Sequence, residues 1–311
     1  MRTFSSWFIP LIALIISAQL GCQKAPAKPM EGRLTENFDQ NWRFHLGDVP
    51  EAKEASFEDV SWRQLNLPHD WSIEGSFSKD NPAGAGGGAL PGGIGWYRKQ
   101  FDAPQDSLDK HLFIEFDGVY MNSEVWINGQ SLGIRPNGYI SFRYDMTPYV
   151  RWGKDNIIAV RVDNAQQPNS RWYSGSGIYR HVRLITTGPA YVDLWGTHIE
   201  TPEVGDSMAV IKVKTQIRQH YAQAENLKVY QRILDPDGQE VVVTDQKVRS
   251  HVGAIRDVDD ELRVAAPRLW SVESPNLYTL ITEIRDFNKT LVDRYTTSFG
   301  IRDFHFDPHR A

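Results

Sequence analysis

The strongest constraint on the fold of this chain is the strict two-residue alternation of apolar and polar side chains in its second half. Ile211, Val213, Thr215 and Ile217 are separated at each step by a charged or amide residue. Because successive side chains of a β-strand point to opposite faces, this pattern predicts a strand with one buried face and one wet face. The same alternation places four further residues on an inward face: Tyr278, Leu280, Thr282 and Ile284.

Turn signals separate short stretches of this kind, and helical periodicity is scarce. Asp237-Gly238 predicts a hairpin between residues 227–234 and 240–244, and Asn288-Lys289 predicts another turn. Many short alternating strands within about 110 residues favour a seven-strand immunoglobulin-like sandwich. The chain has one cysteine, so this sandwich lacks the usual disulfide, and Gly188-Pro189 is the expected boundary in front of it.

The first half of the chain also predicts antiparallel β-structure. Residues 123–128 alternate Ser123, Val125 and Ile127 against Glu124, Trp126 and Asn128, and Asn128-Gly129 is a two-residue hairpin signal. Residues 156–163 place Ile158, Val160 and Val162 on one face, with Arg161 and Asp163 on the other. Together with the second half, this predicts an all-β chain of two sandwiches rather than a parallel α/β sheet.

Composition excludes some functions. The net charge is −5 and no run of Lys or Arg occurs, which argues against a nucleic-acid partner. Aromatic residues make up 12% of the chain. This content fits either β-sheet cores or surfaces that stack on sugar rings. We favour the core interpretation, because strands favour aromatics on packing grounds.

The N-terminus resembles a bacterial lipoprotein signal. Arg2 precedes an apolar run over residues 8–18, which is too short to span a bilayer, and the run ends at Leu20-Gly21-Cys22. We expect residues 1–22 to be the signal, residues 23–32 a linker, and Cys22 the lipidated residue. A plain signal peptide with an incidental cysteine is the alternative. Both predict an exported protein, in the periplasm or anchored to the outer membrane only by its lipid.

A catalytic site is not evident. No pair of carboxylates stands out as a candidate for acid–base catalysis, and the nine histidines lack metal-ligand spacing. No catalytic residue, metal ligand or cofactor is therefore predicted. His69-Asp70 is interpreted as part of a structural loop. The Gly-rich residues 79–95 are interpreted as a mobile surface loop rather than a phosphate site.

Residues 169–180 are the best candidate for a binding loop. They combine an Arg, aromatic rings and hydroxyl groups around two glycines directly after a predicted strand. Such a loop offers flat apolar faces for sugar rings and donors for sugar hydroxyls. The candidate substrate-binding residues are Arg171, Trp172, Tyr173, Ser174 and Ser176. The alternative is a tight turn whose aromatics fill the core.

Seven segments, in order, resemble the amino-terminal region of family 2 glycoside hydrolases, particularly exported bacterial β-galactosidases. They are residues 67–75 (LPHDWSIEG), 95–101 (GWYRKQF), 117–129 (DGVYMNSEVWING), 135–144 (RPNGYISFRY), 170–182 (SRWYSGSGIYRHV), 267–280 (PRLWSVESPNLYTL) and 299–306 (FGIRDFHF). The resemblance implies a jelly-roll sugar-binding domain over residues 33–187, an immunoglobulin-like sandwich over 188–300, and the start of a missing catalytic barrel over 301–311.

The same resemblance implies how the parts work together. The acid/base and nucleophile glutamates belong to the barrel, so no residue of this chain is expected to fill either role. The matching loop, residues 171–179, lies at the rim of the active site in the family, and residues 79–95 are expected to lie nearby. Some relatives place an acidic ligand for galactose and sodium in this loop, where this chain has Ser174.

The sequence thus predicts the non-catalytic front part of a retaining glycoside hydrolase acting on β-galactosides, with its own barrel as partner. One alternative is a standalone surface lipoprotein that binds glycans without cleaving them. Another is a structural partner whose cleft is completed by a separately encoded barrel.

Overall fold

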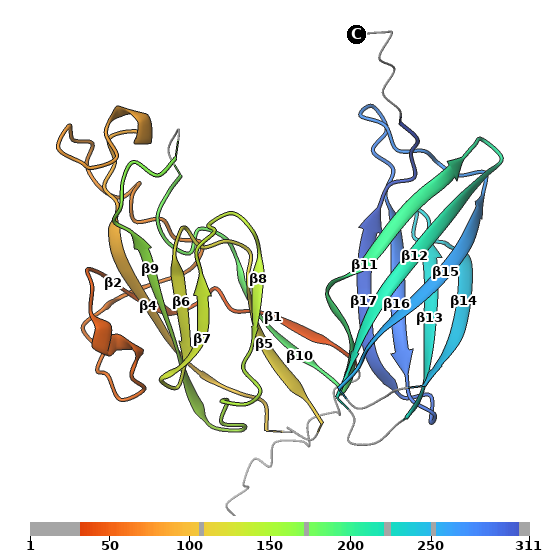
Figure 1. Cartoon of the computed structure of the whole chain (residues 1–311), viewed down its shortest axis with the longest axis horizontal. Coiled ribbons are helices and arrows are strands. Elements are labelled where there is room, and N and C mark those ends of the chain that lie inside the picture. The colour runs from red at the N-terminus through yellow and green to blue at the C-terminus, as the bar shows by residue number, and fades with distance from the viewer. Residues whose placement is uncertain (1–31, 106–108, 171–173, 221–224, 250–252, 305–311) are drawn as a thin grey trace, which may run out of the picture. The chain divides into compact units, whose positions relative to one another are not determined.

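A computed structural model describes residues 32–105, 109–170, 174–220, 225–249 and 253–304. The described residues are almost entirely strands and loops, and two short 3₁₀ turns, η1 (Pro50–Lys53) and η2 (Ala85–Gly87), are their helical elements. Strands β1 to β10 form one pair of sheets and β11 to β17 form another, as Figure 1 shows. The predicted all-β fold of two sandwiches is therefore confirmed.

The first sandwich consists of a six-stranded and a four-stranded antiparallel sheet. In spatial order the larger sheet contains β3 (Arg63–Leu65), β2 (Trp42–Leu46), β4 (Gly93–Asp102), β9 (Asp155–Asn164), β6 (Ser123–Ile127) and β7 (Gln130–Arg135). The smaller contains β1 (Leu34–Asn37), β10 (Val182–Thr187), β5 (His111–Phe116) and β8 (Phe142–Asp145).

The core between these two sheets is rich in aromatic side chains. Trp42 and Tyr97 from the larger sheet and Phe116 and Phe142 from the smaller one belong to the same buried cluster. Ile158, Val160 and Val162 of β9 are fully buried there, as their alternation predicted. Aromatics in this half of the chain therefore serve mainly as core, which agrees with the interpretation made from composition.

The outer face of the six-stranded sheet is also partly covered, which alternation did not predict. Trp126, expected on the polar face of its strand, is 6% exposed and stacks on Trp96 with ring centroids 5.3 Å apart. Trp62 and Ala52, from the segment between β2 and β3, belong to the same small cluster. Alternation failed here because that segment folds back over the sheet, and such a long-range contact leaves no two-residue signal in the strand it covers.

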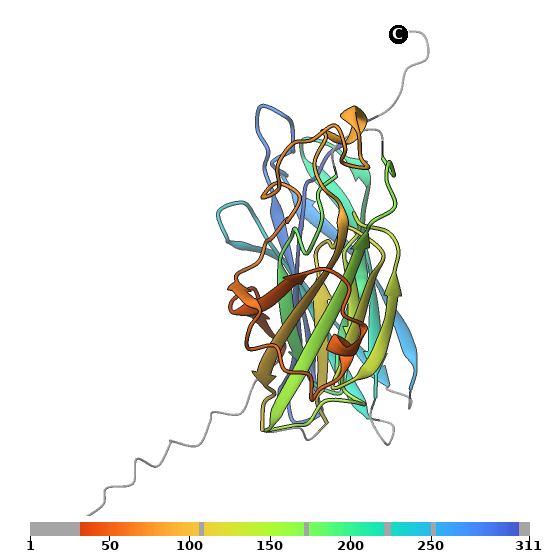
Figure 2. The ribbon, with the colours of Figure 1, turned by 90° about the vertical axis from the view of Figure 1, so that its left-hand side faces the viewer.

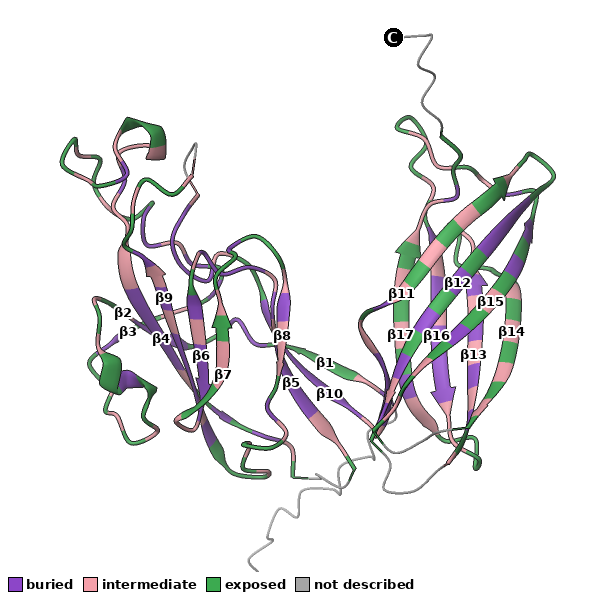
Figure 3. Ribbon diagram, viewed as in Figure 1, coloured by how far each residue is buried: buried purple, intermediate pink, exposed green. Residues whose placement is uncertain are grey.

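The second sandwich has seven strands, as the sequence predicted. One sheet contains β11 (Ala190–Val204), β12 (Met208–Gln219) and β15 (Ile255–Ala265), and the other contains β14 (Glu240–Arg249), β13 (Asn226–Leu234), β16 (Tyr278–Arg285) and β17 (Leu291–Phe299). Its core is mainly aliphatic, with Ile211, Ile233 and Leu280 fully buried. The alternation along β11, β12 and β15 is visible as colour bands in Figure 3.

The predicted turns are present in both halves. Asn128 and Gly129 take positive φ values of 52° and 85° between β6 and β7, as a two-residue hairpin of this type requires. Gly238 has φ 81° in the turn between β13 and β14, and Lys289 has φ 68° between β16 and β17. Local turn chemistry therefore determined these hairpins.

A buried ion pair joins the start of the first sandwich to the second. The guanidinium of Arg33, just before β1, donates to both carboxylate oxygens of Asp293 on β17 at 3.0 and 3.1 Å. It also donates to the Val192 carbonyl, and Asp293 accepts from the Val192 amide at 2.8 Å. Ile301 is fully buried in the core of the second sandwich, so that sandwich extends at least to residue 301.

Candidate functional site

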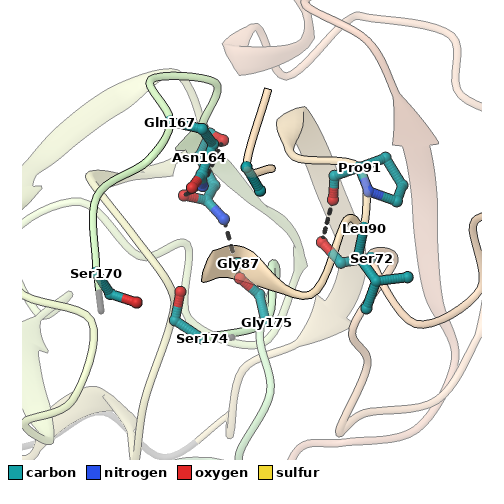
Figure 4. A pocket seen from close by; sticks show the side chains of 10 residues that line it. Ser72, Gly87, Leu90, Pro91, Asn164, Gln167, Ser170, Ser174 and Gly175 are labelled. Carbon is teal, nitrogen blue, oxygen red and sulfur yellow. Dashed lines mark hydrogen bonds between the residues drawn. The ribbon is translucent and has the colours of Figure 1, made fainter. Parts of the chain in front are cut away.

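The loop that follows β9 lies beside the Gly-rich loop before β4, in both views of the chain (Figures 1 and 2). Together with Ser72 they line a small pocket, shown in Figure 4, whose lining residues are Ser72, Ala83, Gly87, Leu90, Pro91, Asn164, Gln167, Ser170, Ser174 and Gly175. The expectation that residues 79–95 lie near the candidate binding loop is therefore confirmed.

The enclosed space of this pocket is about 10 Å³. That is room for about one water molecule, whereas ligand pockets usually measure ~300–1,000 Å³. The described residues around this pocket, called the wall below, thus do not enclose a sugar-sized cavity. A sugar bound here would need further walls around it.

Asn164, at the end of β9, organises this wall. Its amide nitrogen donates to the Gly175 carbonyl at 2.9 Å and to the Ser176 hydroxyl at 2.7 Å. Its amide oxygen accepts from the side chains of Gln167 and Asn169, both at 2.6 Å. An asparagine amide has two donors and an acceptor with two lone pairs, so the side chain is fully satisfied. One buried amide therefore holds both ends of residues 167–175.

Residues 174–178 are also fixed against residues 69–72. The Asp70 carboxylate accepts from the backbone amides of Ser72 at 2.9 Å and Ser176 at 2.8 Å. Gly177 has φ 129°, and a Cβ at this position would lie 2.4 Å from the Tyr97 hydroxyl. Only glycine fits this close approach, which explains the glycine at position 177.

The predicted site residues that the structure describes, Ser174 and Ser176, differ in burial and in position relative to the pocket. Ser174 is half-buried and lines the pocket. Ser176 is fully buried, and its hydroxyl oxygen lies 2.6 Å from that of Ser72 and accepts from Asn164. Ser176 is therefore occupied by partners within the protein and positions the loop. Arg171, Trp172, Tyr173 and Cys22 lie outside the described residues.

His69 occupies a structural position, in agreement with its interpretation as part of a structural loop. Its Nδ1 lies 2.7 Å from the Tyr97 hydroxyl, and its ring contacts Phe44 with centroids 4.6 Å apart. On the other side its Nε2 lies 3.4 Å from a carboxylate oxygen of Glu74. Burial lowers the pKa of His69, although Glu74 opposes this effect.

Glu74 is held ionised by its neighbours. Arg63 donates two hydrogen bonds to it at 2.6 and 2.8 Å. This ion pair is the largest cause that lowers the Glu74 pKa to about 2, and His69 adds to it. Glu74 is therefore a fixed anion over the usual pH range rather than a proton donor.

No local pattern marked Asn164, Ser72 or Gln167 as part of this wall, because buried amide networks depend on contacts across the fold. Asn164 could have been singled out only as a polar residue at the end of an alternating strand. Within the described ranges, no group of three or more His, Cys, Asp or Glu residues is arranged to hold a metal ion. None of the helices in the described part is long and apolar enough to cross a membrane.

Two consecutive domain families match this chain. The sugar binding domain of glycosyl hydrolases family 2 matches residues 35–188, and a second domain described as glycosyl hydrolases family 2 matches residues 191–302. The β-galactosidase BoGH2A of Bacteroides ovatus is 50% identical over 279 residues, which are 90% of this chain and 33% of that protein. A putative β-glucuronidase of Formosa agariphila is 44% identical over 270 residues, or 87% of this chain and 25% of that protein.

Solved structures agree with this assignment. A glycosyl hydrolase family 2 member from Bacteroides cellulosilyticus superimposes with a TM-score of 0.84 at 37% identity, over 88% of this chain and 36% of the other. The two β-sandwiches and their order are those of the amino-terminal part of such glycoside-hydrolase structures. This chain belongs to glycoside hydrolase family 2, and it spans about a third or less of the length of the curated relatives named above.

Proposed function

We propose that this chain is the non-catalytic front part of a glycoside hydrolase that acts on β-galactosides. The observation that carries the proposal is the pair of family matches, which cover residues 35–188 and 191–302 in consecutive order. Hydrolysis of the O-glycosyl bond would be retaining and would require a (β/α)₈ barrel carrying the two glutamates. The front part shapes one wall of the sugar cleft and positions the barrel.

The choice of β-galactosides rests on the relatives. The relative at 50% identity is named a β-galactosidase. The relative at 44% identity is named a putative β-glucuronidase, and the one at 30% identity a β-glucuronidase. A galactoside is neutral and a glucuronide carries a carboxylate. The proposal therefore commits to a neutral sugar at the site beside residues 169–180.

The wall contributes to this site in two ways. Arg171, Trp172, Tyr173 and Ser174 contact the sugar, while Ser176 and Asn164 hold the loop from behind. Support for the second role comes from the hydrogen bonds of Asn164 to Gly175 and Ser176. A loop fixed from behind can present side chains to a ligand without a large ordering cost on binding.

The test is the DNA that follows codon 311, together with the activity of its product. We expect a barrel with family-type glutamates, in frame or after one frameshift. The complete protein should then hydrolyse p-nitrophenyl β-galactoside much faster than p-nitrophenyl β-glucuronide, and the 311-residue chain should hydrolyse neither. A preference for the glucuronide would overturn the choice of substrate.

A clean stop with no barrel in any frame would favour the standalone glycan-binding lipoprotein instead. Calorimetry with β-galacto-oligosaccharides would then show binding to the 311-residue chain. In either case we propose that the protein is exported and lipid-anchored at Cys22. Labelled palmitate should be incorporated into the wild-type protein in cells and lost in Cys22→Ser.

A further inference from the structure

A basic hollow lies on the outer face of the sheet formed by β14, β13 and β16, in the second sandwich. Its volume is about 530 Å³, within the range of small-ligand sites. Five cations line it: Lys228, Lys247, Arg249, Arg285 and Lys289. Among the described residues that line it, the one acidic residue is Asp286. This concentration of positive charge stands on a chain whose net charge is −5.

Three of these cations are direct neighbours across the strands. Lys228 of β13 is paired in register with Lys247 of β14 on one side and with Arg285 of β16 on the other. Like charges placed directly opposite each other destabilise a sheet. A row of three cations is therefore an arrangement that needs anions nearby.

The anions of the protein satisfy only part of this row. Lys228 forms an ion pair with Asp245 at 2.9 Å, and Arg285 forms one with Glu283 at 2.8 Å. Lys247 and Arg249 are exposed, as is Lys289. None of these three forms an ion pair with any residue in the described part of the chain. The hollow thus retains cations that can receive an anionic ligand.

The other sheet of the same sandwich shows the ordinary arrangement. Along β12 and β15, Lys212 is paired in register with Glu261 and Lys214 with Asp259. The two outer faces belong to one domain and are built from strands of similar length. The cross-strand pairs named here join opposite charges on this face and like charges at the hollow. The basic row is therefore not a general property of this sandwich.

Aromatic surface accompanies the cations. Phe287, in the turn after β16, is 69% exposed and lines the hollow. Tyr230 also lines it, with the Lys228 ammonium 4.6 Å from its ring centroid. Small inorganic anions need no apolar wall, whereas a sugar ring has apolar faces and can stack on an exposed aromatic. Cations beside aromatic surface therefore fit a saccharide that carries negative charge.

We propose that this hollow binds an acidic saccharide, a glycan segment with carboxylate groups as in polyuronates. Lys247, Arg249 and Lys289 contact the carboxylates, and Phe287 packs on a sugar face. The hollow would hold a polysaccharide to the protein, separately from the wall in the first sandwich. It goes beyond the neutral β-galactoside function proposed above and does not depend on it.

The test is calorimetry on the 311-residue chain with tetragalacturonate, and with β-1,4-galactotetraose as the neutral probe. We expect binding of tetragalacturonate that weakens as sodium chloride is raised from 0.05 to 0.5 M, because exposed charges are screened by salt. The neutral probe should not bind at this hollow. The double variant Lys247→Gln/Arg249→Gln should weaken tetragalacturonate binding by about tenfold or more, since each charged contact is lost. Phe287→Ala should weaken it by a smaller factor.

The matched control is Lys212→Gln/Arg263→Gln on the outer face of the other sheet. It removes the same two charges from exposed positions of the same sandwich, and it should leave the affinity within twofold of wild type. Equal weakening by both double variants would show attraction by net charge alone and overturn the proposal. Absence of tetragalacturonate binding would overturn it as well. So would binding of the neutral probe that the hollow variant weakens as much as it weakens tetragalacturonate binding. Tighter binding of single-stranded DNA than of tetragalacturonate would overturn the choice of ligand.

Discussion

The two sandwiches of this chain have cores made of different kinds of side chain. The first fills its core with aromatics such as Trp42, Tyr97 and Phe116, and the second with aliphatics such as Ile211 and Leu280. Alternation along the strands of the second is nearly regular. In the first, a returning segment and long connections interrupt it. The strands of the regular sandwich were therefore predictable from alternation, and those of the irregular one only in part, as β9 and the β6–β7 hairpin show.

The connections show where each sandwich can hold a ligand. Residues 66–92 and 165–181 join strands of the first sandwich, and they carry the wall around Asn164. In the second, residues 235–239 and 286–290 are short hairpin turns. Loops on a rigid scaffold commonly carry binding residues. A site made of loops suits the first sandwich, whereas the basic hollow of the second combines the face of a sheet with one short turn.

The largest effect should come from breaking the ion pair that joins the two sandwiches. Asp293→Asn leaves the guanidinium of Arg33, whose side chain is 8% exposed, without its charged partner. Loss of one partner from a buried pair costs about 4 kcal/mol. Urea denaturation should show a much lower midpoint. Asp257→Asn, which removes the exposed partner of Lys214, should leave the midpoint unchanged within error. Equal midpoints for both variants would mean that the Arg33 pair does not hold the regions together.

The next largest effect should be a difference in stability between alanine variants of two glycines, Gly177 and Gly238, which both have positive φ. Gly177→Ala places a methyl group 2.4 Å from the Tyr97 hydroxyl and 2.6 Å from the His69 carbonyl, so the loop must move. We expect the free energy of unfolding to fall by about 3 kcal/mol because of backbone strain and overpacking. Gly238→Ala meets no atom within 4 Å, so only the backbone strain of about 1 kcal/mol applies.

Thermal unfolding of the two glycine variants measures this difference. A Gly177→Ala protein as stable as Gly238→Ala would show that the binding loop is not held tightly against residues 69–72. The proposed role of that loop as a fixed wall would then fail.

The smallest effect should come from Glu74 and depends on pH. Its folded-state pKa is lowered to about 2 from 4.5, mainly by Arg63, so the ion pair stabilises the fold above pH 4.5 and is lost as the pH falls through 2. Because the Glu74 side chain is 39% exposed, Glu74→Gln should cost less than about 1 kcal/mol at pH 6. The difference from wild type should shrink between pH 4.5 and 2. A difference that grows as the pH falls would contradict the assignment.

Much of the fold follows from short-range patterns. Asn128-Gly129 and Asp237-Gly238 determine their hairpins because their backbone conformations are local. The inward faces of β12 and β16 follow from alternation alone. The cover over Trp126 and the pairing of β1 with β10 depend on contacts across more than 50 residues, which no local pattern encodes.

The candidate site was predictable only as a segment. The composition of residues 169–180 singled out the loop, but it did not distinguish Ser174, which lines the pocket, from Ser176, which is fully buried. The two serines are separated by a single glycine, and the distinction comes from Asn164 and Asp70 behind the loop. Burial of a polar side chain depends on its partners, which residue type alone does not reveal.

The position of β1 has a consequence for the order in which the chain folds. Leu34–Asn37 pairs with Val182–Thr187, and Arg33 binds Asp293, so the first strand has no partner until residues about 150 and 260 positions later are available. Synthesis proceeds from the N-terminus, so Arg33 and β1 remain unpaired until the intervening chain has been made. The first sandwich therefore closes late, and a nascent chain interrupted before β10 would leave an edge of β5 exposed to pairing with other chains.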